Sequence, residues 1–217
     1  MKKIFYVFAF MFSFVISIFA QENEITAGLN ALRSGDYNAA FNFYNKFLST
    51  NEKYAPAFYG RALASYKLKD YKKSFDDCKK AISLDNKYAD ALFLAGLNSI
   101  ELNDYKIAIK YFTDALAANP NNTKYLYSRA NAHYFAQMDS EAIEDYSRVI
   151  ELEPSFGFAY YGRGIAYYMA DKFPLAKIDL ENYISLNANK DNLQDEAMRI
   201  LKIIERANKW ANSFKIC

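Results

Sequence analysis

The feature that most constrains this chain is a sequence period that continues without insertion through most of its length. Each repeat holds two stretches of helical apolar spacing, separated by a short polar break. A helical hairpin of this size cannot bury its apolar face alone, so neighbouring repeats must stack on one another. The period therefore predicts an all-α solenoid. The five complete repeats, which are equal in length, are residues 21–54, 55–88, 89–122, 123–156 and 157–190.

Residue types within the repeats support this division. The eighth residue is small in every repeat, and so is the twentieth, as expected where two helix backbones approach closely. Sustained alternation and Asn-Gly or Asp-Gly hairpin turns, which would indicate strands, are missing from the sequence. The small residues are Gly28, Ala62, Gly96, Ala130 and Gly164 at the eighth place, and Ala40, Ser74, Ala108, Ala142 and Ala176 at the twentieth.

The polar breaks carry an aspartate before the second stretch of three repeats, at Asp36, Asp70 and Asp104. An aspartate there can accept a hydrogen bond from the free N–H groups that open a helix. In the fourth repeat the aspartate is shifted by one place, to Asp139. We therefore expect the fourth turn to differ slightly from the others.

These positions resemble the tetratricopeptide repeat, a 34-residue helix-turn-helix unit. The resemblance covers residues 21–190 and rests on the small positions, the Asp-Tyr turns, the aromatic residues at place 24, and Pro120 and Pro154 at place 32. It departs from the family at three arginines that replace a usual leucine and at Cys78, which replaces an aromatic residue. The resemblance implies a right-handed superhelix whose first helices line a concave groove that binds other proteins.

The resemblance also places certain residues of each first helix in that groove. Here these residues are mostly aromatic or aliphatic, and tyrosine suits binding because its rigid apolar ring carries a polar tip. Small residues at 60, 128 and 162 are expected to leave space beside them. The alternative is that the rings only pack between neighbouring helices. The predicted groove residues are Tyr59, Leu63, Tyr66, Phe93, Leu97, Tyr127, Asn131, Tyr134, Tyr161, Ile165 and Tyr168.

Arginine and aspartate occur together in repeats two, four and five, always at the same spacing, and are both missing from these places in repeats one and three. This pattern predicts an ion pair between the two helices of one repeat, because arginine can bind a carboxylate with two parallel bonds. The alternatives are solvated side chains or arginines that bind a ligand. The predicted pairs are Arg61 with Asp77, Arg129 with Asp145, and Arg163 with Asp179.

The first twenty residues have the layout of a secretory signal: Lys2 and Lys3, an uncharged run over residues 4–19, and Ala20 at the end. We expect cleavage before Gln21 and an exported, periplasmic or envelope-associated protein of bacterial type. The alternative is an uncleaved membrane anchor, but the apolar run is shorter than the roughly 20 residues that span a membrane. Two of the 27 basic residues lie in this segment, so those that remain equal the 25 acidic residues. This balance argues against a nucleic-acid partner.

Catalytic motifs, metal-ligand clusters and phosphate-binding loops are missing from the sequence, so we expect no enzyme, cofactor, metal or small-molecule substrate. The single histidine, His133, falls at a helix-packing place and is expected to be structural. The two cysteines do not make a disulfide framework. Cys78 is expected to be a small buried residue, and Cys217 to be exposed.

The last segment, residues 191–217, is predicted to be one helix that caps the fifth repeat, since solenoids need a cap. Its apolar stripe is Leu193, Ala197, Ile200, Leu201, Ile204, Ala207 and Ala211, with Ile203, Trp210 and Phe214 at the edge. We therefore expect a scaffold or adaptor that binds a peptide or protein in a tyrosine-lined groove. The alternative is a structural subunit that forms a homodimer through residues 191–217, if the edge residues are an exposed patch.

Overall fold

The computed structural model describes residues 23–186 and 192–214. The predicted all-α class is confirmed, since these residues form helices and turns without a strand. The proposed signal segment, residues 1–20, lies outside the described residues. The chain divides into two compact units, residues 1–104 and 105–217.

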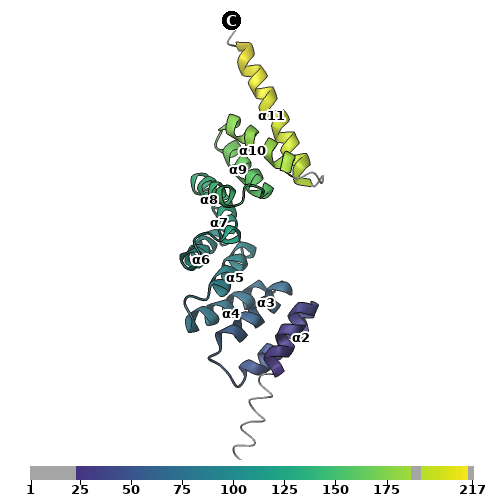
Figure 1. The fold of residues 1–217 in the computed structure, drawn as a ribbon, viewed down its shortest axis with the longest axis vertical. Coiled ribbons are helices and arrows are strands. Elements are labelled where there is room, and N and C mark those ends of the chain that lie inside the picture. The colour runs from purple at the N-terminus through teal and green to yellow at the C-terminus, as the bar shows by residue number, and fades with distance from the viewer. Residues whose placement is uncertain (1–22, 187–191, 215–217) are drawn as a thin grey trace, which may run out of the picture. The chain divides into compact units, whose positions relative to one another are not determined.

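The first unit holds a helix over residues 23–34 and four further helices (Figure 1). These are α2 (Tyr37–Leu48), α3 (Ala55–Lys67), α4 (Tyr71–Leu84) and α5 (Ala89–Glu101). Consecutive helices from α2 to α5 pack against each other, and α3 also contacts α5.

The second unit is built in the same way. Its helices are α6 (Tyr105–Ala118), α7 (Thr123–Phe135), α8 (Asp139–Leu152), α9 (Gly157–Met169), α10 (Phe173–Leu186) and α11 (Asn192–Phe214). Each packs on the next from α6 to α11, and α7 also contacts α9. The two first helices α7 and α9 therefore form one continuous surface within this unit.

A left-handed residue closes the turn after each first helix. In the described part of the chain, positive φ angles occur at the same place of every repeat, namely at Gly35, Lys69, Asn103, Gln137 and Asp171. At each turn the next residue donates its N–H to the carbonyl five residues earlier, as Met138 does to His133 at 2.9 Å. This bond is the Schellman arrangement that ends a helix and satisfies its free carbonyls. Only the first turn has glycine, the residue that adopts this conformation without strain.

The fourth turn does not differ from the others in its backbone, contrary to the expectation from the shifted aspartate. Gln137 has a φ of 60° and the Schellman bond is intact. Only the side-chain cap is lost. Asp36 and Asp70 accept from the amides of Ala39 and Lys73, whereas Met138 holds the cap position of α8 without a side-chain bond. The backbone geometry is set by the positive φ, so it does not require the aspartate.

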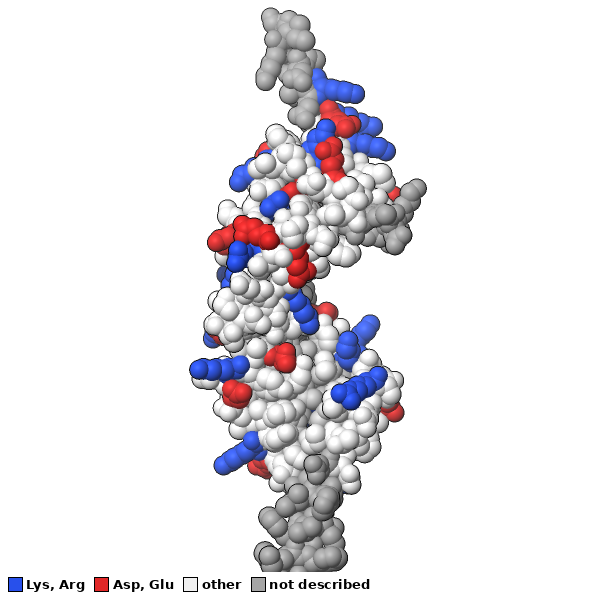
Figure 2. Space-filling model, in the orientation of Figure 1, with Lys and Arg blue, Asp and Glu red and all other residues white. Residues whose placement is uncertain are grey.

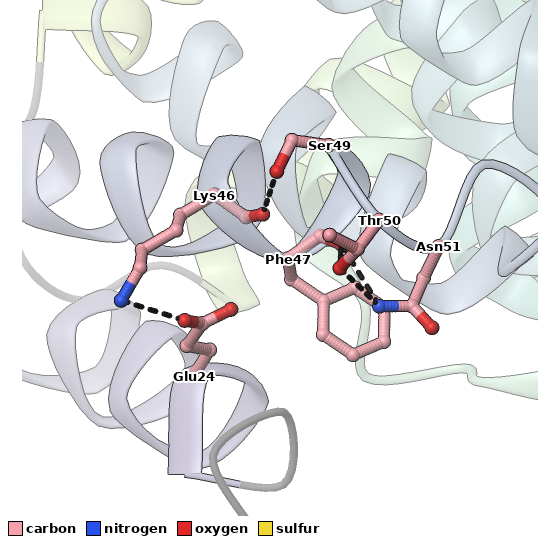
Figure 3. A network of polar contacts seen from close by, with 6 residues as sticks. All are labelled: Glu24, Lys46, Phe47, Ser49, Thr50 and Asn51. Atoms are coloured by element: carbon pink, nitrogen blue, oxygen red, sulfur yellow. Dashed lines mark hydrogen bonds and ion pairs between the residues drawn. The ribbon is translucent and has the colours of Figure 1, made fainter. Parts of the chain in front are cut away.

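Side chains also satisfy the free carbonyls at the end of α2 (Figure 3). The Ser49 hydroxyl donates to the Lys46 carbonyl at 2.7 Å, and Asn51 Nδ2 donates to the Phe47 carbonyl at 3.0 Å. Lys46 in turn forms an ion pair with Glu24, at 2.8 Å between Nζ and Oε1. The helix over residues 23–34 therefore contacts α2 through an ion pair as well as through apolar packing.

Two glycines are required by the tyrosines that pack on them. A Cβ at Gly60 would lie 2.4 Å from the ring of Tyr44, and a Cβ at Gly162 would lie 2.5 Å from the ring of Tyr146. The sequence predicts that these small residues leave open space beside a groove. At Gly60 and Gly162 the tyrosine at place 24 of the preceding repeat fills the space where a side chain would lie, although Gly162 still lines a cavity described below.

Helix α11 packs through its first half. Leu193, Ala197 and Ile200 belong to a cluster with Leu180 and Tyr183 of α10, and Ile204 is also buried. Beyond this point Ala207 is exposed, so its predicted place in the covering stripe is wrong: α11 runs on past the helices that it covers (Figure 1). Ile203 is 50% exposed. The side chains of Ala211, Trp210 and Phe214, and all of Cys217, lie outside the described residues.

Charges of both signs are interspersed on the face of the molecule in Figure 2. Neither unit presents a block of basic side chains on that face, as a nucleic-acid surface would require. Among the described residues, no helix is long and apolar enough to cross a membrane.

Candidate functional site

A cavity of about 280 Å³ lies in the second unit, between α7, α8, α9 and the start of α11. Five aromatic rings line it: Tyr127, Tyr134 and Phe135 from α7, Tyr146 from α8 and Tyr161 from α9. The other lining residues are Asn131, Gly162, Ile165, Leu193 and Glu196. We call this site the aromatic pocket.

Helical spacing brings these residues together. Tyr127, Asn131 and Tyr134 are four and three residues apart, so they share one face of α7. Tyr161 and Ile165 share a face of α9 in the same way. Because α7 packs directly on α9, the two faces form adjoining walls. The structure thus gathers five of the eleven predicted groove residues in one pocket.

Two hydrogen bonds orient the polar groups of the pocket. The Tyr146 hydroxyl donates to Asn131 Oδ1 at 2.6 Å. The Tyr161 hydroxyl donates to Glu196 Oε2 at 2.8 Å, which joins α9 to α11. Both bonds hold a side chain in one orientation before any ligand arrives.

The rings are also held by one another. Tyr127 contacts Tyr146 with ring centroids 5.8 Å apart and Phe156 at 5.1 Å. Tyr161 contacts Tyr183 at 5.1 Å. Such tilted and edge-to-face pairs are favourable arrangements of aromatic rings. Phe135, in contrast, is 52% exposed and also lines the pocket.

The phenol groups of the pocket remain protonated at neutral pH. Burial raises the pKa of Tyr127, Tyr146 and Tyr161, and the Glu196 carboxylate raises that of Tyr161 further. Burial also raises the pKa of Tyr134, and so do the negative charges of Asp139 and Glu196. The tyrosines therefore act as hydrogen-bonding groups and as neutral π surfaces, not as bases.

The remaining predicted groove residues lie elsewhere. Tyr168 packs on Phe173 of α10, with centroids 5.8 Å apart, and does not line the pocket. Tyr59 and Tyr66 lie in the first unit, where their rings contact Tyr88 and Tyr71. Leu63 and Leu97, in the same unit, are half-buried.

Phe93 is 6% exposed and so offers no accessible groove surface, contrary to its predicted place in an open channel. Helix α5 is apolar around most of its circumference, and residues 91–96 are all buried. A groove position in the repeat therefore does not by itself keep a side chain exposed.

The structure brings each predicted arginine to its aspartate with two hydrogen bonds. Arg163 Nε and Nη2 lie 2.7 and 2.9 Å from the Asp179 carboxylate oxygens. The corresponding distances are 2.8 and 2.7 Å for both Arg61 with Asp77 and Arg129 with Asp145. The aspartate side chains are 3–8% exposed, so these are semi-buried forked pairs.

Each arginine also has a second partner, bound by a third hydrogen bond, that was not predicted from the sequence. Its Nη1 donates to a polar side chain on the second helix of the preceding repeat. These acceptors are Asn45 for Arg61 at 2.7 Å, Thr113 for Arg129 at 3.2 Å and Ser147 for Arg163 at 3.0 Å. The signal was present, because repeat three has Ala95 in place of the arginine and the corresponding acceptor place before it holds Lys79. The arginines therefore join neighbouring repeats as well as the helices within one repeat.

His133 and Cys78 occupy structural positions. The His133 side chain is 10% exposed, with Nε2 3.6 Å from Asp145 Oδ2. Burial raises the pKa of the Cys78 thiol to about 12, so it stays protonated and unreactive. Within the described residues, no group of His, Cys, Asp and Glu side chains could hold a metal ion.

Comparison with known proteins identifies the repeat. Two tetratricopeptide repeat models match residues 25–90 and 89–122. Rat sperm-associated antigen 1 is 38% identical over 102 residues, which are 47% of this chain and 11% of that protein. Rat serine/threonine-protein phosphatase 5 is 27% identical over 99 residues, 46% of this chain and 20% of that protein. The chain thus spans about a fifth or less of these curated relatives.

Solved structures share the fold. The crystal structure of YrrB, described as a tetratricopeptide repeat protein with an unusual peptide-binding site, has a TM-score of 0.74 and 23% identity, covering 81% of this chain and 90% of YrrB. MamA from Desulfovibrio magneticus RS-1 has a TM-score of 0.75 and 17% identity, covering 80% of this chain and 98% of that one. The chain is a helical repeat protein of stacked helix pairs. It is a tetratricopeptide repeat protein, and residues 25–122 match the family in sequence.

Proposed function

We propose that this chain is a non-enzymatic interaction module that holds a peptide segment of a partner protein in the aromatic pocket. The observation that carries the proposal is the pocket itself, with five rings and two oriented polar groups around one cavity. Concave, mostly apolar sites with a few placed polar groups are typical of ligand binding. Buried tyrosines are frequent energetic anchors of interfaces.

The relatives support a protein partner. YrrB has a peptide-binding site by its description, and the wheat Hsp70-Hsp90 organizing protein is 24% identical over 102 residues. The phosphatase matches over only 20% of its length, so its activity is not carried over to this chain. What the relatives share with this chain is a repeat scaffold that supports protein–protein interaction.

Site-specific photo-crosslinking tests the proposal. Phe135, 52% exposed at the pocket, would be replaced by p-benzoylphenylalanine in the full chain, expressed in the cells from which the sequence comes. A discrete crosslinked protein is expected. The control places the same group at Met169, which is 58% exposed and does not line the pocket. Equal crosslinking from both positions, or none from position 135, contradicts the proposal.

We further propose that the partner is met outside the cytoplasm, because Lys2, Lys3 and the apolar run to Ala20 have the layout of an export signal. N-terminal sequencing of the chain from an envelope fraction is expected to begin at Gln21. Intact Met1 in the membrane fraction would identify an anchor instead.

A second candidate function, self-association, rests on the second half of α11. Glu205, Arg206 and Ala207 are exposed, and Ile203 is 50% exposed beside them. A stop codon at Arg206 would keep the packed half of the helix, so the repeats should stay folded. A dimer in solution that is lost on this truncation would support self-association, and a monomer for the full chain would exclude it.

A further inference from the structure

The aromatic pocket combines aromatic rings with a single negative charge. Five of its ten lining residues are aromatic, and among the described residues that line it Glu196 is the charged one. The face of an aromatic ring carries negative potential and attracts cations. Ring faces and a carboxylate therefore favour the same kind of ligand.

The Glu196 carboxylate is oriented by Tyr161 and can still accept further hydrogen bonds. Tyr161 donates one hydrogen bond to Oε2 of Glu196. A carboxylate has about four acceptor sites, so Glu196 can accept further bonds from a ligand. The bond from Tyr161 also holds Glu196 at the pocket, which reduces the conformational entropy that binding would cost.

The surroundings oppose an anionic ligand. Asp139 and Glu196 both raise the pKa of Tyr134, which indicates a negative potential at this wall of the pocket. The arginines on α7 and α9, Arg129 and Arg163, are already paired with their aspartates. Glu196 is exposed, so its charge is accessible to a ligand, and a cation gains an attraction to it that a neutral apolar ligand does not.

The size of the cavity limits the ligand. At about 280 Å³ it is near the lower end of the range for ligand pockets, so it fits one side chain and not a folded surface. We propose that the aromatic pocket receives the cationic side chain of a lysine or arginine in the partner's peptide segment, with the rings around the charged group and Glu196 as its counter-ion. This inference rests on the proposed function and specifies its ligand.

The test uses the full chain, labelled with ¹⁵N, and four acetylated and amidated pentapeptides Ala-Ala-Xaa-Ala-Ala. The variable residue is arginine, lysine, glutamate or citrulline, which has the shape of arginine without its charge. The arginine and lysine peptides are expected to shift the amide resonances of residues 127–135, 161–165 and 193–196. They should bind about ten-fold more tightly than the citrulline peptide.

Glu196→Gln keeps the size of the side chain and removes the charge, so it should remove most of the ten-fold preference for arginine over citrulline. Glu205→Gln is the matched control, since Glu205 is exposed on the same helix and does not line the pocket. Equal binding of arginine and citrulline, a preference for glutamate, shifts outside these residues, or no shift at millimolar peptide would each overturn the inference.

The crosslinking experiment separates failure of this inference from failure of the proposed function. Suppose that a partner crosslinks at position 135 equally well in the parent chain and in Glu196→Gln, and that the arginine and citrulline peptides bind equally. The proposed function then stands, and the preference for a cationic side chain is excluded. Binding of the arginine peptide without any crosslinked partner supports the pocket's preference for a cation and contradicts its use as a partner site.

Discussion

Tyr146 packs its ring against the backbone of Gly162, so closely that a Cβ there would lie 2.5 Å from Cζ and 2.8 Å from the hydroxyl oxygen. The same relationship joins Tyr44 to Gly60 in the first unit. In both cases the tyrosine lies on the second helix of the repeat that precedes the glycine. The contact therefore sets the distance between successive repeats and also places the Tyr146 hydroxyl at the aromatic pocket.

Gly162→Ala should destabilise the second unit by about 1–3 kcal/mol, because the added methyl group must displace the buried Tyr146 ring. Ser128→Ala is the matched control: it changes the same place of the preceding repeat, where a Cβ is already present, and should cost within about 0.5 kcal/mol. Urea unfolding of both variants measures the difference. Equal stability of Gly162→Ala and the parent chain would mean that Tyr146 has room to move.

Arg129→Ala should cost roughly 1–3 kcal/mol of stability, since it leaves the buried Asp145 carboxylate without its forked partner. Removing both residues should cost less than the sum of the two single changes. A double-mutant cycle by chemical unfolding measures this coupling, which we expect to exceed about 1 kcal/mol. Thr113→Val removes only the outer bond of 3.2 Å and should cost far less. A coupling near zero would show that the pair does not stabilise the fold.

Gln137→Gly should stabilise the second unit by about 1 kcal/mol, since Gln137 holds a φ of 60° that costs a non-glycine residue free energy. Ala136→Gly, one residue earlier at a φ of −81°, has no such strain to relieve and should be neutral or destabilising. Thermal unfolding of the two variants is the measurement. If Gln137→Gly lowered the melting temperature as Ala136→Gly is expected to, the strain would be excluded.

Protonation of His133 should destabilise the fold. Burial lowers its pKa below 6.5, and this outweighs the opposite effect of Asp145, while Arg129 lowers it further. The unfolded chain therefore binds the proton more readily than the folded chain does. The free energy of unfolding should fall as the pH decreases from 6.5 to the lower pKa of the folded chain. Above pH 6.5, His133 should make the free energy of unfolding no more dependent on pH. His133→Gln should lose this component, measured as the difference between the two unfolding curves across pH. Parallel curves would contradict the lowered pKa.

The helices and their pairing followed from the sequence because both depend on local spacing. An apolar period near that of the α-helix, within a repeat of constant length, is compatible with few other folds. The joint occurrence of Arg163 and Asp179 in one repeat predicted their contact. The second partner of Arg163, Ser147, was missed because it lies in the preceding repeat and not in the repeat of the arginine.

Other features depended on contacts that no repeat position encodes. The place of Glu196 at the pocket depends on how α11, which lies outside the five complete repeats, packs onto α9 and α10. Phe93 holds a groove position in its repeat, yet the apolar character of its whole helix buries it. The position of a residue in the repeat therefore predicted the helix face on which it lies. The neighbouring side chains determined whether that face is exposed to solvent.

The pocket can be separated from the core by truncating its rings. Phe135→Ala should lower stability by less than about 1 kcal/mol, because the ring is 52% exposed, yet weaken binding at the pocket by about ten-fold or more. Phe112→Ala removes a fully buried ring of α6 and should cost roughly 3–5 kcal/mol through the cavity that it leaves. Met169→Ala, a truncation at a side chain that is 58% exposed outside the pocket, should affect neither quantity.

Two measurements decide the outcome: urea unfolding for stability, and titration with the arginine pentapeptide for binding. Tyr134→Ala extends the test, since Tyr134 lines the pocket and its ring lies edge-on to Phe135 with centroids 5.5 Å apart. If Phe135→Ala and Tyr134→Ala unfold the chain as readily as Phe112→Ala, these rings belong to the core and the cavity is only a packing gap. If both variants stay folded and bind the peptide as the parent does, binding occurs on another surface, for which the exposed half of α11 is the next candidate.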